Sequence, residues 1–173
     1  MANRQKQKGD AGERDAVKYL LELCPDLCRP GSQRHLGAGR REDVGDLWVF
    51  REAAVQVKAY GAAGLSAAMY DSATSAVIQA KHGRVPFGVG MVKMHNARPG
   101  TNRWIAASVG WPDVPAGLVE FKASTAAAEW AKRLPADDRS VGIVTRAGSP
   151  VIHVAPFHTW VDAFREARKS EAA

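Results

Sequence analysis

GDLWVFREAAVQVKAY, residues 45–60, consists of two short apolar runs separated by a polar Arg-Glu pair. Valine and aromatic residues favour extended structure in both runs, and residues 51–53 supply the connection between them. The stretch therefore predicts a β-hairpin in which Phe50 pairs with Ala54 across a three-residue loop.

Three polar side chains of this hairpin are predicted to share one face of the sheet. Counting outward from the loop places Asp46 opposite Lys58, and directly opposed residues project to the same side. In the second strand Gln56 projects to the same face as Lys58, while the neighbouring valines face the other way. An acid, an amide and an ammonium on an otherwise apolar sheet cost free energy unless they bind something.

The length and composition of the chain predict one domain with an anionic partner. A length of 173 residues with 46% hydrophobic content suits a single domain with a real core. The net charge of +6 favours nucleic acid as the partner. No apolar run could span a membrane and the first ten residues lack the core of a signal peptide. We therefore expect a soluble cytoplasmic protein with no membrane partner, from a bacterial cell or a phage-infected host.

Periodicities along the rest of the chain predict alternating helices and strands. Asp10 as N-cap and Glu13 three residues later form a capping box for a helix over about 11–23, after a flexible basic arm at 1–9. Further helices are predicted at about 66–82, 124–133 and 157–168, and further strands at 87–94, 103–109, 140–146 and 150–156. Small residues would let the 66–82 helix lie close against a sheet. The order predicts an α/β or α+β domain, residues 1–173, with a central mixed β-sheet flanked by helices.

Residues 29–43, RPGSQRHLGAGRRED, predict a mobile basic loop. The segment has no regular apolar periodicity and cannot bury itself. Its charge pattern alone is equally compatible with a solvated linker and with a surface that contacts DNA.

The polar positions of the hairpin suit a divalent cation. Mg²⁺ takes oxygen ligands, and Asp46 could supply a carboxylate, Gln56 a side-chain carbonyl and Val57 a backbone carbonyl. Lys58 could stabilise phosphate charge or hold an attacking water, and Glu13 would complete the set from the buried side of its helix. Such a site could hydrolyse phosphodiester bonds.

Each of these residues also has a purely structural explanation. Glu13 can be the third residue of a capping box, and Asp46 can simply follow Gly45 in a turn. Gln56 and Lys58 can lie on the solvated face of an antiparallel strand.

Four segments resemble the PD-(D/E)xK nuclease superfamily, and within it the archaeal-type Holliday junction resolvases. They are KGDAGERDAVKYLLE, CRPGS, VGDLWVF and VQVKAY, and with the following helix they cover about the first 82 residues. The resemblance implies a restriction-endonuclease-like core with an extended C-terminal part, and activity that depends on Mg²⁺ or Mn²⁺.

The resemblance assigns a role to five positions. Glu13 resembles the helix-borne acid that helps to order the metal or its water, and Ser32 resembles the hydroxyl of the resolvases' mobile loop. Asp46 and Gln56 resemble the two metal-binding positions, and Lys58 resembles the catalytic lysine.

The sequence departs from the family at two positions. The second metal position, normally Asp or Glu, is Gln56, as in the Gln-x-Lys pattern of the Mrr-like restriction nucleases, which lowers the negative charge by one. Gly45 stands where the family name has proline.

The resemblance also implies partners. Resolvases of this kind act as symmetric dimers because two opposed strands are nicked, so a homodimer is expected. Four-way junctions present converging backbones, which basic side chains can track without reading sequence. The side chains expected to do so are Lys8, Arg29, Arg34, His35, Arg40 and Arg41.

The sequence leaves three functions open. The first choice is a structure-selective DNA endonuclease, a Holliday junction resolvase. The second is a restriction- or repair-type nuclease that cuts ordinary duplex. The third is a catalytically silent DNA-binding module of the same fold, which lost metal affinity at Gln56.

Overall fold

The computed structural model describes residues 2–34, 44–60, 64–94, 103–113 and 117–171. Their helices are α1 (Ala2–Leu23), α2 (Leu65–Gly83), α3 (Ser124–Ala131) and α4 (Phe157–Glu171). Their strands are β1 (Gln33–Arg34), β2 (Leu47–Trp48), β3 (Ala53–Tyr60), β4 (Phe87–Met94), β5 (Trp104–Ser108), β6 (Leu118–Phe121), β7 (Val141–Val144) and β8 (Ile152–Pro156).

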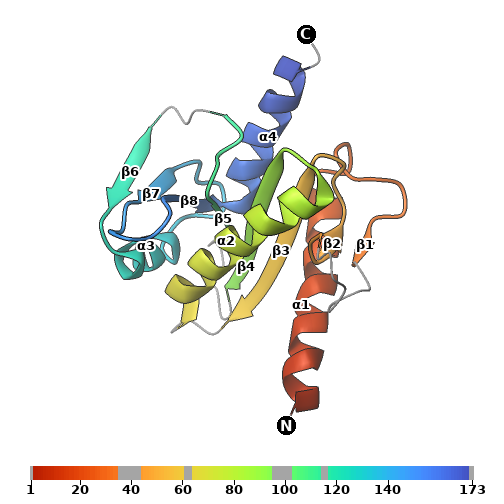
Figure 1. The fold of residues 1–173 in the computed structure, drawn as a ribbon, viewed down its shortest axis with the longest axis horizontal. Helices are drawn as coiled ribbons and strands as arrows, with labels where there is room; N and C mark the ends of the chain where they lie inside the picture. The colour runs from red at the N-terminus through yellow and green to blue at the C-terminus, as the bar shows by residue number, and fades with distance from the viewer. Residues whose placement is uncertain (1, 35–43, 61–63, 95–102, 114–116, 172–173) are drawn as a thin grey trace.

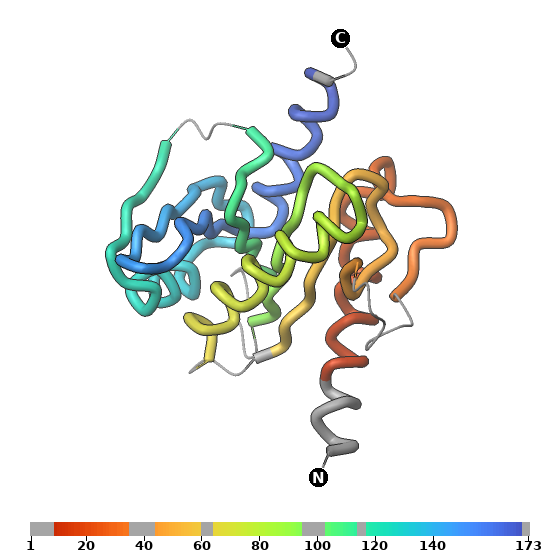
Figure 2. Tube along the Cα trace, viewed as in Figure 1, coloured from red at the N-terminus to blue at the C-terminus, as the bar shows by residue number. Residues whose placement is uncertain are grey.

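These strands form one mixed sheet in the order β1-β2-β3-β4-β5-β8-β7-β6, with β1 and β6 at opposite edges (Figure 1). The pairs β3–β4 and β6–β7 are parallel, and the other neighbours are antiparallel. The prediction of an α+β domain with a mixed sheet is confirmed. Figure 2 follows the chain through this sheet from the orange β1–β2 region to the β6 edge.

Helices cover both faces of the sheet because its central strands are apolar on both faces. Met91 of β4 belongs to the core that includes Leu20 of α1 and Trp160 of α4. The next residue, Val92, belongs to the opposite core, which includes Met69 of α2. Alternation along β4 thus places α1 and α4 on one face, and α2 and α3 on the other.

Helix α2 lies unusually close to β4, as its small residues predicted. A Cβ atom on Gly88 would overlap the backbone at Ala76, and one on Gly90 would overlap Ser72. Glycine is therefore needed at both strand positions. This close approach brings the side chains of α2 to the neighbouring strand, β3.

Helix α1 begins at Ala2, so the predicted start near residue 11 and the loose arm at 1–9 are wrong. Residues 2–8 contain alanine, arginine, glutamine and lysine, which are all good helix formers. Asp10 is consequently no N-cap and Glu13 no third residue of a capping box, because both lie inside the helix. The structural explanation of Glu13 from the sequence does not hold.

Strand β6 was not anticipated by the sequence pattern. It is short, it follows a segment rich in glycine and proline, and both Leu118 (44% exposed) and Val119 (41%) face outward. An edge strand of this kind has no buried alternate face, so it carries no period-2 signal. Among the described residues, no helix combines the length and apolar character needed to cross a membrane.

Helix α4 supplies the largest aromatic cluster. Trp160 and Phe164 stack with their ring centroids 4.9 Å apart, and both side chains are fully buried. Phe50, from the connection between β2 and β3, lies 5.3 Å from Phe164 and 6.0 Å from Trp160. The hairpin is therefore fixed to the C-terminal helix by aromatic packing.

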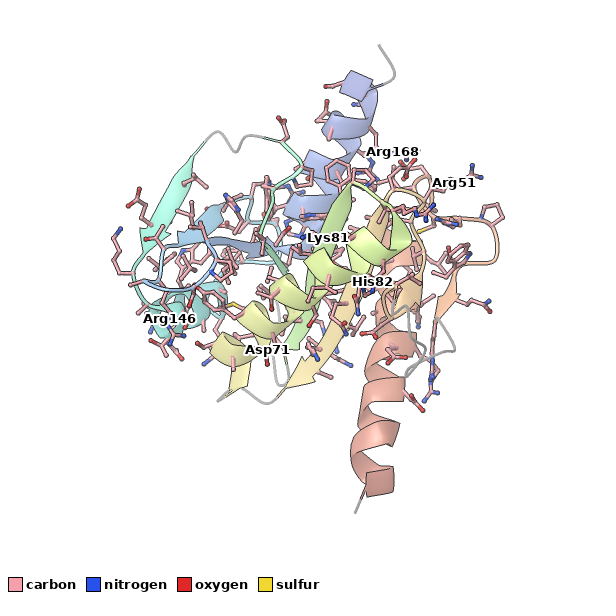
Figure 3. The ribbon with its side chains drawn as sticks, in the orientation of Figure 1. Arg51, Asp71, Lys81, His82, Arg146 and Arg168 are labelled. Atoms are coloured by element: carbon pink, nitrogen blue, oxygen red, sulfur yellow. The ribbon has the colours of Figure 1, made fainter. Side chains whose placement is uncertain are left out.

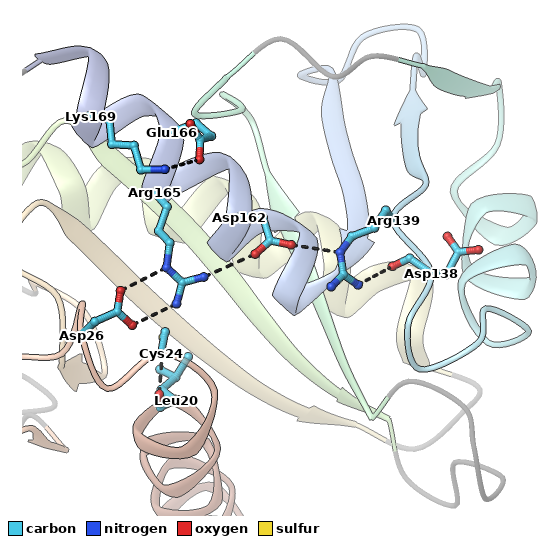
Figure 4. Close-up of polar contacts among 9 residues, drawn as sticks. All are labelled: Leu20, Cys24, Asp26, Asp138, Arg139, Asp162, Arg165, Glu166 and Lys169. Atoms are coloured by element: carbon cyan, nitrogen blue, oxygen red, sulfur yellow. Dashed lines mark hydrogen bonds and ion pairs between the residues drawn. The ribbon is translucent and has the colours of Figure 1, made fainter. Parts of the chain in front are cut away.

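Ion pairs reinforce the attachment of α4. Arg165 binds Asp26 through two bonds of 2.9 and 3.1 Å, and Asp162 pairs with Arg139 at 2.9 Å (Figure 4). Near the other end of α4, Arg168 pairs with Glu52 at 3.2 Å. Figure 3 shows this end of α4 alongside the connection that carries Arg51.

Candidate active site

The hairpin forms as predicted, but its register differs. Leu47 pairs with Val55, which places Asp46 opposite Gln56. The predicted pairing of Asp46 with Lys58 is wrong by two residues. A shift of two preserves the face of every side chain, so the three polar groups still share one side.

Arg29 accounts for the shifted register. Its backbone N–H donates to the carbonyl of Val49 (2.8 Å), and its guanidinium donates to the carbonyls of Phe50 (2.7 Å) and Arg51 (3.2 Å). These bonds draw the chain out of the strand after Trp48. The turn is therefore set by a residue about twenty positions away, not by the hairpin's own sequence.

Asp46 lies next to the point at which the pairing of β3 with β2 ends. Strand β2 has two residues and β3 has eight, so the backbone of β3 beyond Val55 has no strand partner on this side among the described residues. The Asp46 carboxylate replaces that partner, because its Oδ2 accepts the backbone N–H of Val57 at 2.8 Å. The carboxylate and the carbonyl of Val57 consequently face the same space.

Gly45 gives Asp46 this position. Its φ of +113° is a conformation that residues with side chains rarely adopt, and a Cβ there would lie 3.3 Å from the backbone N and O of Val55. The residue before the acid therefore has to be glycine in this fold, which explains the missing proline.

Gln56 extends the cluster into the protein. Its Nε2 donates to Asp46 Oδ2 and lies 3.4 Å from the carbonyl oxygen of Val57. Its Oε1 accepts a hydrogen bond from Nε2 of Gln79 on α2. Gln56 is 8% exposed and Gln79 is 3% exposed, so the two amides are hydrogen-bonded to each other inside the protein, as buried polar groups generally are.

Glu13 reaches the same cluster from α1. Burial raises the pKa of its carboxyl, and the nearby Asp46 carboxylate raises it further. Arg34 lowers the pKa of Glu13, because its Nε lies 3.2 Å from that carboxylate; its Nη2 also pairs with Asp10 at 3.1 Å. Two acids from separate elements thus lie close enough to repel each other, and Arg34 of β1 offsets the repulsion.

Lys58 completes the polar face of β3. It follows Gln56 by two residues and is half-buried, on the same face of the strand. None of the ion pairs among the described residues includes it.

Ser32 is hydrogen-bonded within the turn between α1 and β1. Its hydroxyl donates to the carbonyl of Arg29 at 2.7 Å, and its backbone N–H donates to the same carbonyl at 3.2 Å. The contacts of Ser32 shape the turn that leads to the hairpin.

The residues expected to bind DNA have different surroundings. Arg29 stacks on Trp48 at 3.8 Å and is committed to backbone carbonyls, and burial lowers its pKa. Arg34 is paired with acids, so neither arginine stands free for phosphate. His35, Arg40 and Arg41, with the side chain of Lys8, lie outside the described residues.

The donor set suits a hard cation. Among the described residues, no group of three or more His, Cys, Asp or Glu side chains could hold a metal ion. The oxygens gathered here are instead two carboxylates, a backbone carbonyl and an amide, from Glu13, Asp46, Val57 and Gln56. The Gln56 amide nitrogen lies between the oxygens of Asp46 and Val57, so these oxygens already surround a hydrogen-bond donor. Oxygen ligands of this mixed type are those that Mg²⁺ and Mn²⁺ take, and the fit requires the amide to present its oxygen.

Two neighbours of the site were not anticipated. Gln79 interrupts the small-residue stripe formed by Ser72, Ala76 and Ala80 of α2, and a long amide side chain in such a stripe was a detectable signal. Trp48 is 43% exposed and lies under the Arg29 guanidinium. Its place in a predicted strand was the only sequence feature that could have indicated this position.

Comparison of the chain with protein-family models, with curated proteins and with solved structures finds no match.

Proposed function

We propose that the protein is a metal-dependent, structure-selective DNA endonuclease, with a Holliday junction resolvase as the first choice. The convergence of Asp46, Gln56 and Val57 at the edge of β3, beyond its pairing with β2, supports this most strongly. We further propose that the elements from α1 to β4 form a restriction-endonuclease-like core.

The acids and the carbonyl would bind the cation. Asp46 and the Val57 carbonyl hold oxygens in fixed directions, since the strand backbone and one hydrogen bond orient both. Glu13 would add a second carboxylate, and Gln56 would add an amide oxygen. A bound Mg²⁺ would activate water and neutralise phosphate charge.

Lys58 would act on the phosphate. Hydrolysis joins the OH of water to phosphorus, breaks the bond to one bridging oxygen and delivers a proton to that oxygen. The ammonium of Lys58, two residues along the strand from Gln56, would stabilise the extra negative charge or hold the attacking water.

A cleavage assay on three DNA structures tests the proposal. The full chain is incubated with labelled four-way junction, flap and linear duplex, each with Mg²⁺, Mn²⁺ or chelator. Paired symmetric nicks in the junction alone, only with metal, are expected. Equal cutting of linear duplex would instead assign a restriction- or repair-type nuclease.

One observation favours a second candidate, a silent DNA-binding module. The Gln56 amide nitrogen, not its oxygen, is directed at Asp46, and this hydrogen bond satisfies the carboxylate without a metal. Tight, salt-sensitive junction binding without product under any metal would select this candidate.

A further inference from the structure

Gln79 is a buried polar group next to the site that the proposed chemistry does not use. It lies on α2, 3% exposed, and its Nε2 donates to Oε1 of Gln56. The position of a Cβ on Gly45 lies 3.6 Å from Gln79 Oε1, so the other end of the amide lies against the segment that carries Asp46. Gln79 therefore contacts the site from the side opposite to solvent.

The contact determines which atom of Gln56 faces Asp46. A carboxamide has an acceptor oxygen on one side and a donor NH₂ group on the other. Because Gln79 donates to the oxygen of Gln56, the NH₂ group of Gln56 is directed at Asp46 and Val57. A cation in that position needs the opposite orientation.

We propose that Gln79 is a positioning residue that controls the orientation of Gln56, so that the two amides turn together between two states. In one state the NH₂ group of Gln56 satisfies Asp46, as the structure has it. In the other, Gln56 Oε1 faces a divalent cation and Gln56 Nε2 donates to Gln79 Oε1. The inference rests on the proposed cation site.

The coupling follows from burial. If Gln56 turned alone, two NH₂ groups would face each other, and each would lose an acceptor in a place that water does not reach. An unsatisfied buried donor costs roughly 1–3 kcal/mol. If both amides turn, the hydrogen bond between them is kept with its direction reversed.

A glutamate introduced at position 56 would need no such turn. One carboxylate oxygen could accept from Gln79 Nε2 while the other faces the cation. Gln79→Glu should therefore act differently in the parent and in the Gln56→Glu variant. In the parent it supplies a fixed acceptor for Gln56 Nε2 and favours the cation-binding state, whereas in the Gln56→Glu variant it removes the donor and adds a like charge.

The test is Mn²⁺ binding to the full chain, measured by calorimetry for the parent, Gln79→Glu, Gln56→Glu and the double variant. Gln79→Glu should raise the affinity about tenfold in the parent background and should not raise it in the Gln56→Glu background. An equal gain in both backgrounds would mean that added charge alone is acting and would overturn the proposal. No gain in the parent background would overturn it as well.

A second measurement needs no variant at position 79. Magnesium is titrated into the ¹⁵N-labelled parent, and the side-chain NH₂ signals of both glutamines are followed by NMR. Both should change at the same Mg²⁺ concentration. A change at Gln56 with Gln79 unaffected would contradict the coupled turn.

The inference and the nuclease proposal fail separately. Mn²⁺ binding with the predicted dependence on Gln79, but without DNA cleavage, would overturn the nuclease proposal and support the role of Gln79. Metal-dependent cleavage, with Gln79→Glu raising Mn²⁺ affinity equally in both backgrounds, would support the nuclease proposal and overturn the role of Gln79. Absence of Mn²⁺ binding in every variant would overturn both.

Discussion

The half of the protein from α1 to β4 and the half from β5 to α4 contribute different kinds of side chain to the shared interior. In the second half, the side chains of Phe157, Trp160 and Phe164 are fully buried. The first buries the polar side chains of Gln56 and Gln79 and half-buries the carboxyl of Glu13. The two halves share one sheet and its apolar cores, but the largest fully buried aromatic side chains come from the second half and the buried amides come from the first.

The difference indicates that the first half supplies the candidate site and the second half supplies much of the stability. Buried polar groups contribute little net stability and become costly when one partner is lost. The half that carries the site is therefore held by its neighbour, through Phe50 in the aromatic cluster and through the Arg165–Asp26 pair. Changes at the site residues of the first half should affect chemistry, and changes in the aromatic cluster of the second half should affect unfolding.

The largest effect is expected at the carboxylate and the ammonium of the site. Asp46→Asn and Lys58→Ala should each lower junction cleavage by about 10²–10³-fold or more, because the first removes a proposed cation ligand and the second removes the ammonium proposed to act on the phosphate. Junction binding should persist, since the proposed phosphate contacts come mainly from other basic side chains. Either variant cutting at the parent rate would contradict the site assignment.

The aromatic cluster should give the largest effect on stability. Phe164→Ala should lower the free energy of unfolding by roughly 3–5 kcal/mol, because it empties a fully buried site. Urea unfolding measures it, with Ile78→Ala on an exposed face of α2 as the matched control, expected within about 0.5 kcal/mol of the parent. Similar losses in the two variants would mean that the aromatic cluster does not contribute the expected stability.

Restoring an acid at position 56 should strengthen the site. Gln56→Glu should raise Mg²⁺ affinity about tenfold and keep or increase cleavage, because it adds a negative charge beside Asp46. Calorimetry and the junction assay measure these effects. A large loss of cleavage in this variant would mean that the amide has a task that a carboxylate cannot perform.

Two histidines of the second half should make stability depend on pH just below neutrality. Burial lowers the pKa of His158 and of His153 below the ordinary value of 6.5, so the unfolded chain takes up protons first as the pH falls. Stability should therefore be full above about pH 6.5 and decrease as the pH falls through that value toward the lower folded pKa values.

His158→Gln separates this effect from general acid unfolding. The imidazole Nε2 lies 2.7 Å from the carbonyl of Asp138, and a glutamine amide could donate there without titrating. The variant should lose about half of the decrease in urea midpoint between about pH 7 and 5. An unchanged pH profile would show that His158 is not one of the groups responsible.

The smallest effect is expected at Ser32. Ser32→Ala removes one hydrogen bond to Arg29 and should cost about 1 kcal/mol of stability, with cleavage unchanged at low temperature. Reduced cleavage at unchanged stability would instead give the hydroxyl the loop role that the family resemblance implies.

Much of the fold and part of the site could be predicted because the relevant signals are local. The period of β3 placed Gln56 and Lys58 on one face, and a register error of two left that result intact. The error itself arose because Arg29 fixes the turn from a distant segment. The contact between Gln79 and Gln56 depends on how closely α2 approaches β4, which no local pattern specifies.

The central claim, that the polar cluster at the edge of β3 is a divalent-cation site, is tested most directly by Mn²⁺ titration of the parent and of Asp46→Asn. We expect one bound ion per chain in the parent and loss of that binding in the variant, with the same unfolding midpoint in both metal-free proteins. Equal Mn²⁺ binding by the two proteins, or none by the parent, would contradict the claim.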